Sequence, residues 1–150
     1  MKNELLVKDV MWKDVDIVDR NLSVQDGLDT MQHRKTKMLI VDKAHENDEY
    51  GVVLIADIAG KVIAKNRSLD RVNVYEIMNK PAISVHSTMY IRYCARLLTR
   101  LNISRCPVID EGKLVGVVSL TSIVFRNNEL LSLIHISEPT RRYAISYAVF

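Results

Sequence analysis

The sequence predicts an α+β protein built from two copies of one β-α-β-β-α unit, packed as a pseudo-two-fold pair. The short apolar run Gly51–Asp57 returns as Gly116–Ser122, each time as a strand that ends in a polar residue suited to capping a helix. With 150 residues, of which 48% are hydrophobic and 26% charged, the chain fits one globular domain. A single copy of about 60 residues buries too little apolar surface to be stable alone. We therefore expect the two copies to pack together.

Each copy begins with a helical turn followed by a strand. Residues 7–11 place Val7, Val10 and Met11 on one side of a turn, and residues 74–78 repeat this pattern. The short alternating runs at 15–18 and 82–85 are typical of strands.

A helix is expected next in each copy. Ser23 and Asp26 resemble a capping box, with aspartate in place of the usual glutamate or glutamine. Apolar stripes then predict the two helices, formed by Val24, Leu28 and Met31 in the first copy and by Ile91, Ala95, Leu98 and Leu101 in the second.

The remaining elements of each copy are a pair of strands and a closing helix. Strands are expected at 37–42 and 105–110. A polar loop, residues 43–50, follows the first, whereas residues 111–113 predict a hairpin turn after the second. We expect Asp57 or Ser122 to cap the closing helix. The copies are assigned to residues 1–66 and 67–130.

Residues 131–150 resemble the translation of sequencing adaptors rather than natural protein. Residues 131–141 resemble a transposase adaptor, and residues 145–150 resemble the flow-cell adaptor that follows such an index. We predict that this tail is an artefact and exclude it from reasoning about the fold. The natural C-terminus then need not be present. A genuine C-terminal strand or helix is the alternative.

Several classes of function receive no support from the sequence. No apolar run reaches the roughly 20 residues that span a bilayer, and the N-terminus lacks a signal core, so we expect a cytoplasmic protein without membrane contact. The net charge is only +3 and the basic residues form no block, which argues against nucleic-acid binding.

Cys94 and Cys106 lack metal-type spacing and are expected to be buried thiols. Three scattered histidines, His33, His45 and His86, suggest no metal site, and the absence of catalytic motifs predicts a protein that is not an enzyme.

The repeated elements resemble a tandem pair of CBS domains, the regulatory repeats named after cystathionine β-synthase. The resemblance spans roughly Val7 to Asn127. The turns Val10-Met11 and Ile77-Met78, the strand that ends in residues 107–110 and the two Gly-Val-Val strands carry it by their order rather than singly. Residues 71–81 also look like those of small stand-alone bacterial CBS-pair proteins.

This resemblance implies two clefts that bind adenosyl ligands in many members of the family, and a further dimerisation of the pair. The implied regulatory ligands are AMP, ATP, NAD and S-adenosylmethionine; none is implied to be required. The family's signature is Gly, two apolar residues, Ser or Thr, two further positions and Asp. The first copy has Asp57 but Leu54 in the hydroxyl position, whereas the second has Ser119, with Thr121 close by, but Ser122 in the aspartate position. Each cleft therefore has half of the usual polar groups.

The resemblance assigns a ribose contact to Asp57 and a phosphate contact to Ser119, with Ser122 as a weaker ribose partner. The walls of the second cleft would be formed by Pro81, Ala82, Ile83, Arg105, Cys106 and Pro107. Each residue also has a plainer interpretation: Asp57 as a helix cap, Ser119 as a solvent-facing strand residue, Arg105 as a surface side chain, and the wall segments as ordinary strands.

Two interpretations of function stay open. The first is a regulatory sensor that binds an adenosyl nucleotide of the AMP or ATP kind between its repeats and reports occupancy through the geometry of a homodimer. The alternative is a ligand-free module for dimerisation and for docking an unidentified protein partner.

Overall fold

The computed structural model of the protein describes residues 4–136, and its backbone forms two compact units. One unit consists of residues 13–84. The other joins the N-terminal residues up to Trp12 to the chain from Val85 onward. Each unit has its own buried core.

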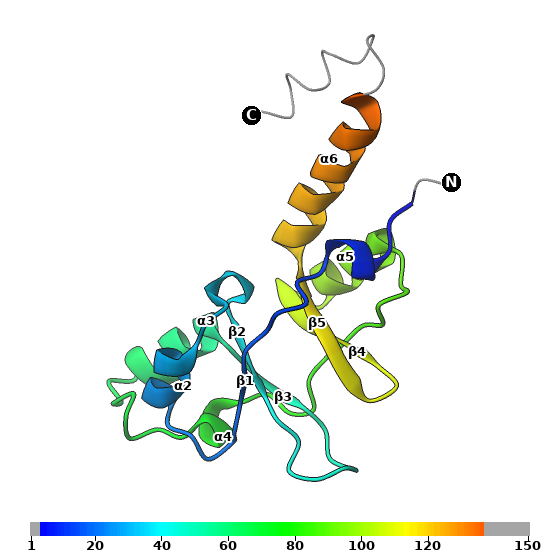
Figure 1. Cartoon of the computed structure of the whole chain (residues 1–150). Coiled ribbons are helices and arrows are strands. Elements are labelled where there is room, and N and C mark those ends of the chain that lie inside the picture. The colour runs from blue at the N-terminus through cyan, green and yellow to red at the C-terminus, as the bar shows by residue number, and fades with distance from the viewer. Residues whose placement is uncertain (1–3, 137–150) are drawn as a thin grey trace. The chain divides into compact units, whose positions relative to one another are not determined.

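The unit of residues 13–84 is built on a three-stranded sheet. Strand β1 (Ile17–Val18) pairs in parallel with β2 (Met38–Val41), which pairs antiparallel with β3 (Gly51–Leu54). All four residues of β2 are buried, as expected for a central strand. Figure 1 shows α2 and α3 on the same side of this sheet. The helical elements of the unit are α2 (Val24–Thr30), η1 (Arg34–Thr36), α3 (Ile55–Ile58), the π-helical turn η2 (Ala59–Ile63) and α4 (Val74–Ile77).

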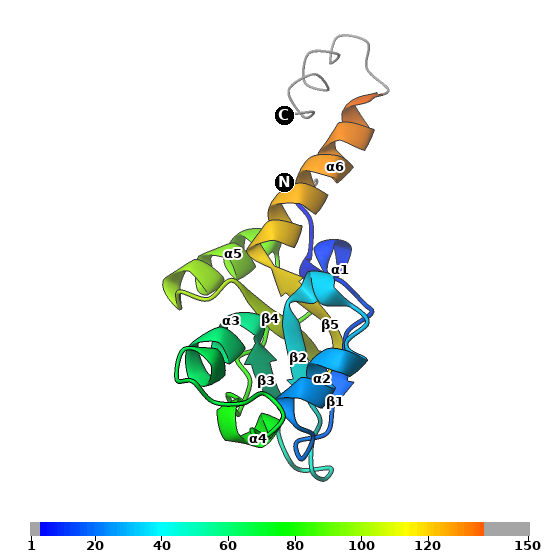
Figure 2. The same ribbon diagram turned by 90° about the vertical axis from the view of Figure 1, so that its left-hand side faces the viewer.

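The second unit is built on a hairpin flanked by helices. Strands β4 (Arg105–Asp110) and β5 (Lys113–Ser119) pair antiparallel. The hairpin turn is confirmed: Glu111 and Gly112 both have positive φ, 50° and 79°, as a type I′ turn requires. Helix α6 (Leu120–Ile136) starts directly after β5 (Figure 2), and the remaining helices are α1 (Val7–Val10) and α5 (Ile91–Arg100).

Each sequence repeat opens with a helical turn, α1 in the first and α4 in the second. Helix α1 belongs to the compact unit that contains β5 of the second repeat, and α4 belongs to the unit that contains β3 of the first repeat. Trp12, which follows α1, forms an antiparallel bridge with Val117 of β5, with N···O distances of 2.8 and 2.9 Å. Asn79, which follows α4, forms the equivalent bridge with Val52 of β3 at 2.8 and 2.9 Å. The compact units therefore divide the chain differently from the sequence repeats. The boundaries 1–66 and 67–130 stay a prediction about the repeat.

Gly51 begins β3 and Gly116 lies in the middle of β5, and at both glycines the helical turns approach the strands. A Cβ on Gly116 would lie 2.5 Å from the backbone oxygen of Trp12. A Cβ on Gly51 would lie 3.0 Å from Sδ of Met78. The sequence position of these glycines thus reflects close packing of a second backbone segment.

Three details of the secondary-structure prediction are wrong. Residues 82–85 form no strand, because Pro81 has no N–H and the segment makes isolated contacts; only Val85 bridges, in parallel, to Val108. Strand β1 has two residues rather than four. Leu101 lies just past the end of α5 and is 41% exposed, so it does not belong to the buried stripe.

The predicted tail falls partly within the described chain. Residues 131–136 continue α6, and residues 137–150 lie outside the described part. The adaptor origin of residues 131–150 stays a prediction. Among residues 4–136, no helix is both long and apolar enough to cross a membrane.

Candidate functional site

Asp57 occupies the third position of α3 and bonds back to the residue before the helix. Its Oδ2 accepts hydrogen bonds from the backbone N–H of Leu54 and from Nδ2 of Asn79, both at 3.2 Å. The expectation that Asp57 itself is the N-terminal cap is corrected: Leu54 holds that position, and Asp57 is the acidic partner of a capping box. Both bonds use Oδ2, so Oδ1 of this half-exposed carboxylate is left for another donor.

The segment that leads from α4 to Pro81 is held along β3 by contacts from several elements. Nζ of Lys61 donates to the backbone oxygen of Ile77 at 3.1 Å. Beyond the bridge of Asn79, the backbone N–H of Ala82 donates to the oxygen of Tyr50 at 2.9 Å. These contacts hold the segment along β3, and the side chain of Asn79 reaches the carboxylate of Asp57.

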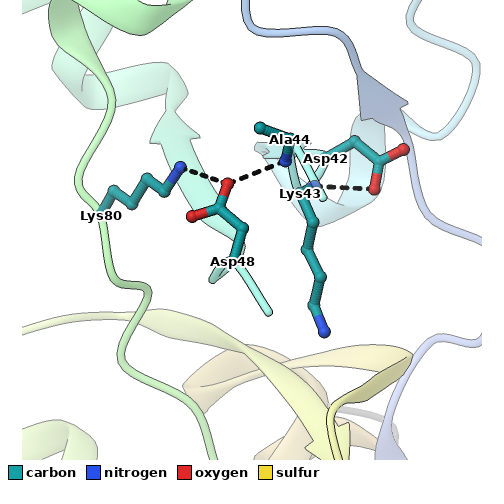
Figure 3. A network of polar contacts seen from close by, with 5 residues as sticks. All are labelled: Asp42, Lys43, Ala44, Asp48 and Lys80. Carbon is teal, nitrogen blue, oxygen red and sulfur yellow. Dashed lines mark hydrogen bonds and ion pairs between the residues drawn. The ribbon is translucent and has the colours of Figure 1, made fainter. Parts of the chain in front are cut away.

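Asp48 ties the same segment to the polar loop of residues 43–50. Its Oδ2 accepts from Nζ of Lys80 at 2.7 Å and from the backbone N–H of Ala44 at 2.8 Å (Figure 3). The hydrogen bonds from Lys80 and Ala44 hold the pKa of Asp48 well below its usual range. In the same network Asp42 accepts from the N–H of Lys43. The loop is thus anchored rather than free, and no sequence pattern joins Asp48 to Lys80.

Of the predicted wall residues in this unit, Pro81 and Ile83 are exposed and Ala82 is half-buried. The exposed fraction of Ile83 is 47%, which is high for an apolar side chain of this size. Pro81, Ala82 and Ile83 belong with Asp57 to the unit of residues 13–84, whereas Arg105, Cys106 and Pro107, predicted as walls of the same cleft as residues 81–83, belong to the other unit.

In the second unit, Ser119 and Ser122 cap each other. Oγ of Ser119 accepts from the N–H of Ser122, and Oγ of Ser122 accepts from the N–H of Ser119, both at 3.0 Å. The hydroxyl of Ser122 also donates to the backbone oxygen of Ser119 at 3.0 Å. The exposed fractions of Ser119 and Ser122 are 0% and 3%, so the interpretation of Ser119 as a solvent-facing residue is wrong. The expectation that Ser122 is the N-terminal cap of the closing helix is also wrong, because Ser119 precedes the first residue of α6 and Ser122 is its capping-box partner. Thr121, by contrast, is exposed.

Arg105, Cys106 and Pro107 begin β4, and Arg105 pairs directly across the hairpin with Ser119. Cys106 and Pro107 are buried, whereas Arg105 is half-exposed. Burial lowers the pKa of the Arg105 guanidinium. The structure therefore brings Arg105 near the start of α6, while Cys106 and Pro107 face the interior.

The two cysteines are free and buried, as predicted. Burial raises the pKa of Cys94 to about 11. Burial and the nearby Cys94 raise the pKa of Cys106 to about 12. Both thiols stay protonated at neutral pH, which makes them packing residues rather than nucleophiles. In residues 4–136, no three His, Cys, Asp or Glu side chains come together as metal ligands would.

Comparison with known proteins identifies both repeats. The model of the CBS domain matches residues 7–64 and again residues 74–129. The chain is 32% identical over 122 residues to a homoserine O-acetyltransferase of Methanosalsum zhilinae, which is 81% of this chain but 24% of that enzyme. The chain spans less than half the length of the first curated relatives it matches.

Two solved structures extend the likeness to three dimensions. A hexameric CBS-CP12 protein from bloom-forming cyanobacteria has a TM-score of 0.79 and 32% identity, over 93% of this chain and 78% of that one. The CBS-domain pair of protein MJ0100, in complex with 5′-methylthioadenosine and S-adenosyl-L-methionine, has a TM-score of 0.69 and 26% identity, over 81% of this chain and 94% of that one. CBS pairs are regulatory modules. Two successive matches that cover most of the sequence show that this chain belongs to the CBS-domain family, as a tandem pair.

Proposed function

We propose that the chain is a regulatory module that binds an adenosyl ligand, with Asp57 as the ribose contact. The observation that carries this proposal is the state of the Asp57 carboxylate. Oδ2 is fixed by Leu54 and Asn79, while Oδ1 faces no partner among the described residues. A carboxylate already held in place loses little freedom when it accepts a hydroxyl hydrogen bond.

Phosphate contacts are less well supported than the ribose contact. The hydroxyls of Ser119 and Ser122 are engaged with each other and buried, and the first copy has Leu54 at the hydroxyl position. In the other unit, considered by itself, the groups that remain for a phosphate are the exposed hydroxyl of Thr121 and the half-buried Arg105. We therefore rank S-adenosylmethionine and 5′-methylthioadenosine, the ligands of the MJ0100 pair, above AMP, ATP and NAD.

The apolar walls of the site remain part of the proposal. Pro81, Ala82 and Ile83 would lie against the adenine, and the exposed side chain of Ile83 offers it an apolar surface. Arg105, Cys106 and Pro107, the other predicted walls, belong to the unit that contains β4 and β5, and Cys106 and Pro107 are buried there, so the proposal for Asp57 gives them no contact.

The proposed output is a shift in assembly rather than a reaction. A ligand biases an equilibrium between two arrangements only by its differential affinity for them. A homodimer, a protein partner that reads this shift and a cytoplasmic location complete the proposal, in which the chain is not an enzyme. Some relatives carry enzyme names, but the match covers 24% of such a protein.

A thermal-shift screen of the full chain tests ligand binding. The probes are S-adenosylmethionine, 5′-methylthioadenosine, AMP, ATP and NAD, each at 1 mM. A ligand present at 100 times its dissociation constant adds about 2.7 kcal/mol to the free energy of unfolding. We expect the first two compounds to raise Tm and Asp57→Asn to remove most of that rise. Asp14→Asn, at an exposed aspartate of the same unit, is the matched control.

The second candidate function is ligand-free dimerisation and partner docking. The closed capping box of Ser119 and Ser122 favours it, because those polar groups need no ligand. It predicts that none of the five compounds changes Tm and that Asp57→Asn leaves assembly unchanged. That outcome would replace the ligand-binding proposal.

A further inference from the structure

The outer face of α5 carries a row of arginines. Arg92, Arg96 and Arg100 are spaced four residues apart, so they lie along one side of the helix. All three are exposed. The sequence of α5 contains no acidic residue, so this row has no counter-charge on its own helix.

Tyr93 orders the first part of this row. The guanidinium carbons of Arg92 and Arg96 lie 4.6 and 5.5 Å from the centre of its ring. Nη2 of Arg92 also donates to the Tyr93 hydroxyl at 3.2 Å. Stacking on an aromatic ring restricts a guanidinium without consuming all of its donors. The arginines are thus partly ordered before any partner arrives.

The positive charge of the row is only partly compensated within the described chain. Glu4 forms an ion pair with Arg92. Arg96 and Arg100 form none of the ion pairs found among the described residues. Like charges four residues apart on a helix destabilise it. An anionic group placed between Arg96 and Arg100 would remove that cost.

The surface is also hollowed at this point. An open hollow of about 440 Å³ is lined by Ala95, Arg96, Thr99 and Arg100. The hollow is shallow and its lining is mostly apolar, so it suits the apolar stem of an acidic side chain whose carboxylate reaches Arg96 or Arg100. Arginine binds carboxylates through two parallel hydrogen bonds, which gives such a contact direction as well as charge.

We propose that this α5 face, defined as Arg92, Tyr93, Arg96, Thr99 and Arg100, docks an acidic segment of a partner protein. Carboxylates of the segment pair with Arg96 and Arg100, and an apolar side chain packs on Tyr93, which is 46% exposed. Arginine and tyrosine are the residue types that contribute most to protein interfaces. A second copy of this chain fits less well, because a two-fold contact through the row would oppose arginine to arginine.

Fluorescence anisotropy with a defined peptide tests the proposal. The probe is a labelled peptide of alternating Glu and Leu residues, and the control probe has Gln in place of Glu. With the full chain we expect saturable binding of the Glu peptide that weakens as salt rises. The double variant Arg96→Glu and Arg100→Glu should weaken binding at least tenfold. The control Lys35→Glu and Lys113→Glu changes two exposed lysines elsewhere and should change binding less than twofold.

Four outcomes would overturn the proposal. These are no binding by the unaltered chain, equal binding of the Gln peptide, unchanged binding by the arginine variant, and displacement of the peptide by 1 mM inorganic phosphate, which would indicate a small-anion site. Analytical ultracentrifugation adds a further test, since loss of self-association in the arginine variant would assign the face to a second copy. Circular dichroism of the variant confirms that the fold is retained, so loss of binding reports on the face itself.

Discussion

Replacing Gly116 with alanine is expected to lower the free energy of unfolding by about 2–4 kcal/mol. The added Cβ would lie 2.5 Å from the backbone oxygen of Trp12 and 2.8 Å from Sδ of Met11. A methionine side chain can move aside, but a backbone oxygen moves only with its chain.

The magnitude follows from the contacts that such a movement would disturb. The backbone oxygen of Trp12 accepts from the N–H of Val117 at 2.9 Å, and the N–H of Trp12 donates to the oxygen of Val117 at 2.8 Å. Each hydrogen bond contributes about 0.5–1.5 kcal/mol. Overpacking in a well-packed region costs about 1–3 kcal/mol. Partial loss of both bonds together with moderate overpacking gives the expected range.

The matched control is alanine at Gly51, the equivalent position of the other repeat. There the nearest atom to a Cβ would be Sδ of Met78 at 3.0 Å, followed by the backbone oxygen of Asn79 at 3.4 Å. The thioether can adjust, and alanine restricts the unfolded chain more than glycine does. We expect the free energy of unfolding to change by less than about 1 kcal/mol.

Urea unfolding of both variants, followed by circular dichroism, provides the comparison. We expect Gly116→Ala to shift the midpoint to clearly lower urea and Gly51→Ala to leave it nearly unchanged. Equal midpoints for the two variants, or a Gly116→Ala variant within 0.5 kcal/mol of the unaltered protein, would refute the close approach of Trp12 to β5.

The remaining predictions concern three other features. Ser119→Ala should lower the free energy of unfolding by about 1–2 kcal/mol in urea titrations, because the N–H of Ser122 loses its acceptor; no measurable change would contradict the mutual cap. The folded-state pKa of Asp48 is depressed, so its stabilising effect is present above the unfolded pKa of about 3.9 and is lost as pH falls through the folded value. Asp48→Asn should therefore be less stable than the unaltered protein at pH 7, with a gap that narrows in acid; a gap independent of pH would contradict this. Cys94 and Cys106 should resist a thiol reagent at pH 8 and react once guanidinium unfolds the chain, whereas rapid reaction of the native protein would contradict their burial.

The repeated order of elements could be predicted because it depends on local pattern. The hairpin turn at Glu111 and Gly112 requires positive φ at neighbouring positions, and the Glu-Gly sequence between two apolar runs indicates this directly. The helix that starts after Ser23 was predictable for the same reason, since Ser23 accepts from the N–H of Asp26 at 3.0 Å.

The pairing of each repeat's opening helical turn with a strand of the other repeat could not be predicted from local pattern. Nothing in the sequence near Trp12 indicates that it bridges Val117 rather than a strand of its own repeat. Likewise, Asp48 and Lys80 meet only because the chain folds back along β3. Such pairs depend on tertiary contacts between residues that are distant in sequence.

The sequence indicates which polar residues stand at the starts of α3 and α6, but not which groups they bond to. Ser119 and Ser122 stand three residues apart at a helix start, which is the spacing of a capping box. That spacing could have indicated that the two hydroxyls serve the helix rather than a ligand. Asp57 has the same spacing from Leu54: its Oδ2 accepts from the N–H of Leu54, but Leu54 has no side-chain acceptor for the N–H of Asp57, so this capping box is one-sided.

Isothermal titration of the full chain with S-adenosylmethionine tests the central claim most directly. We predict saturable heat with the unaltered protein and with the control Asp14→Asn. For Asp57→Asn, the dissociation constant should be at least tenfold weaker, because a charge-assisted hydrogen bond to the ribose is lost, worth roughly 1.5–3 kcal/mol. No heat from the unaltered protein, or equal affinity in the Asp57→Asn variant, would contradict the account.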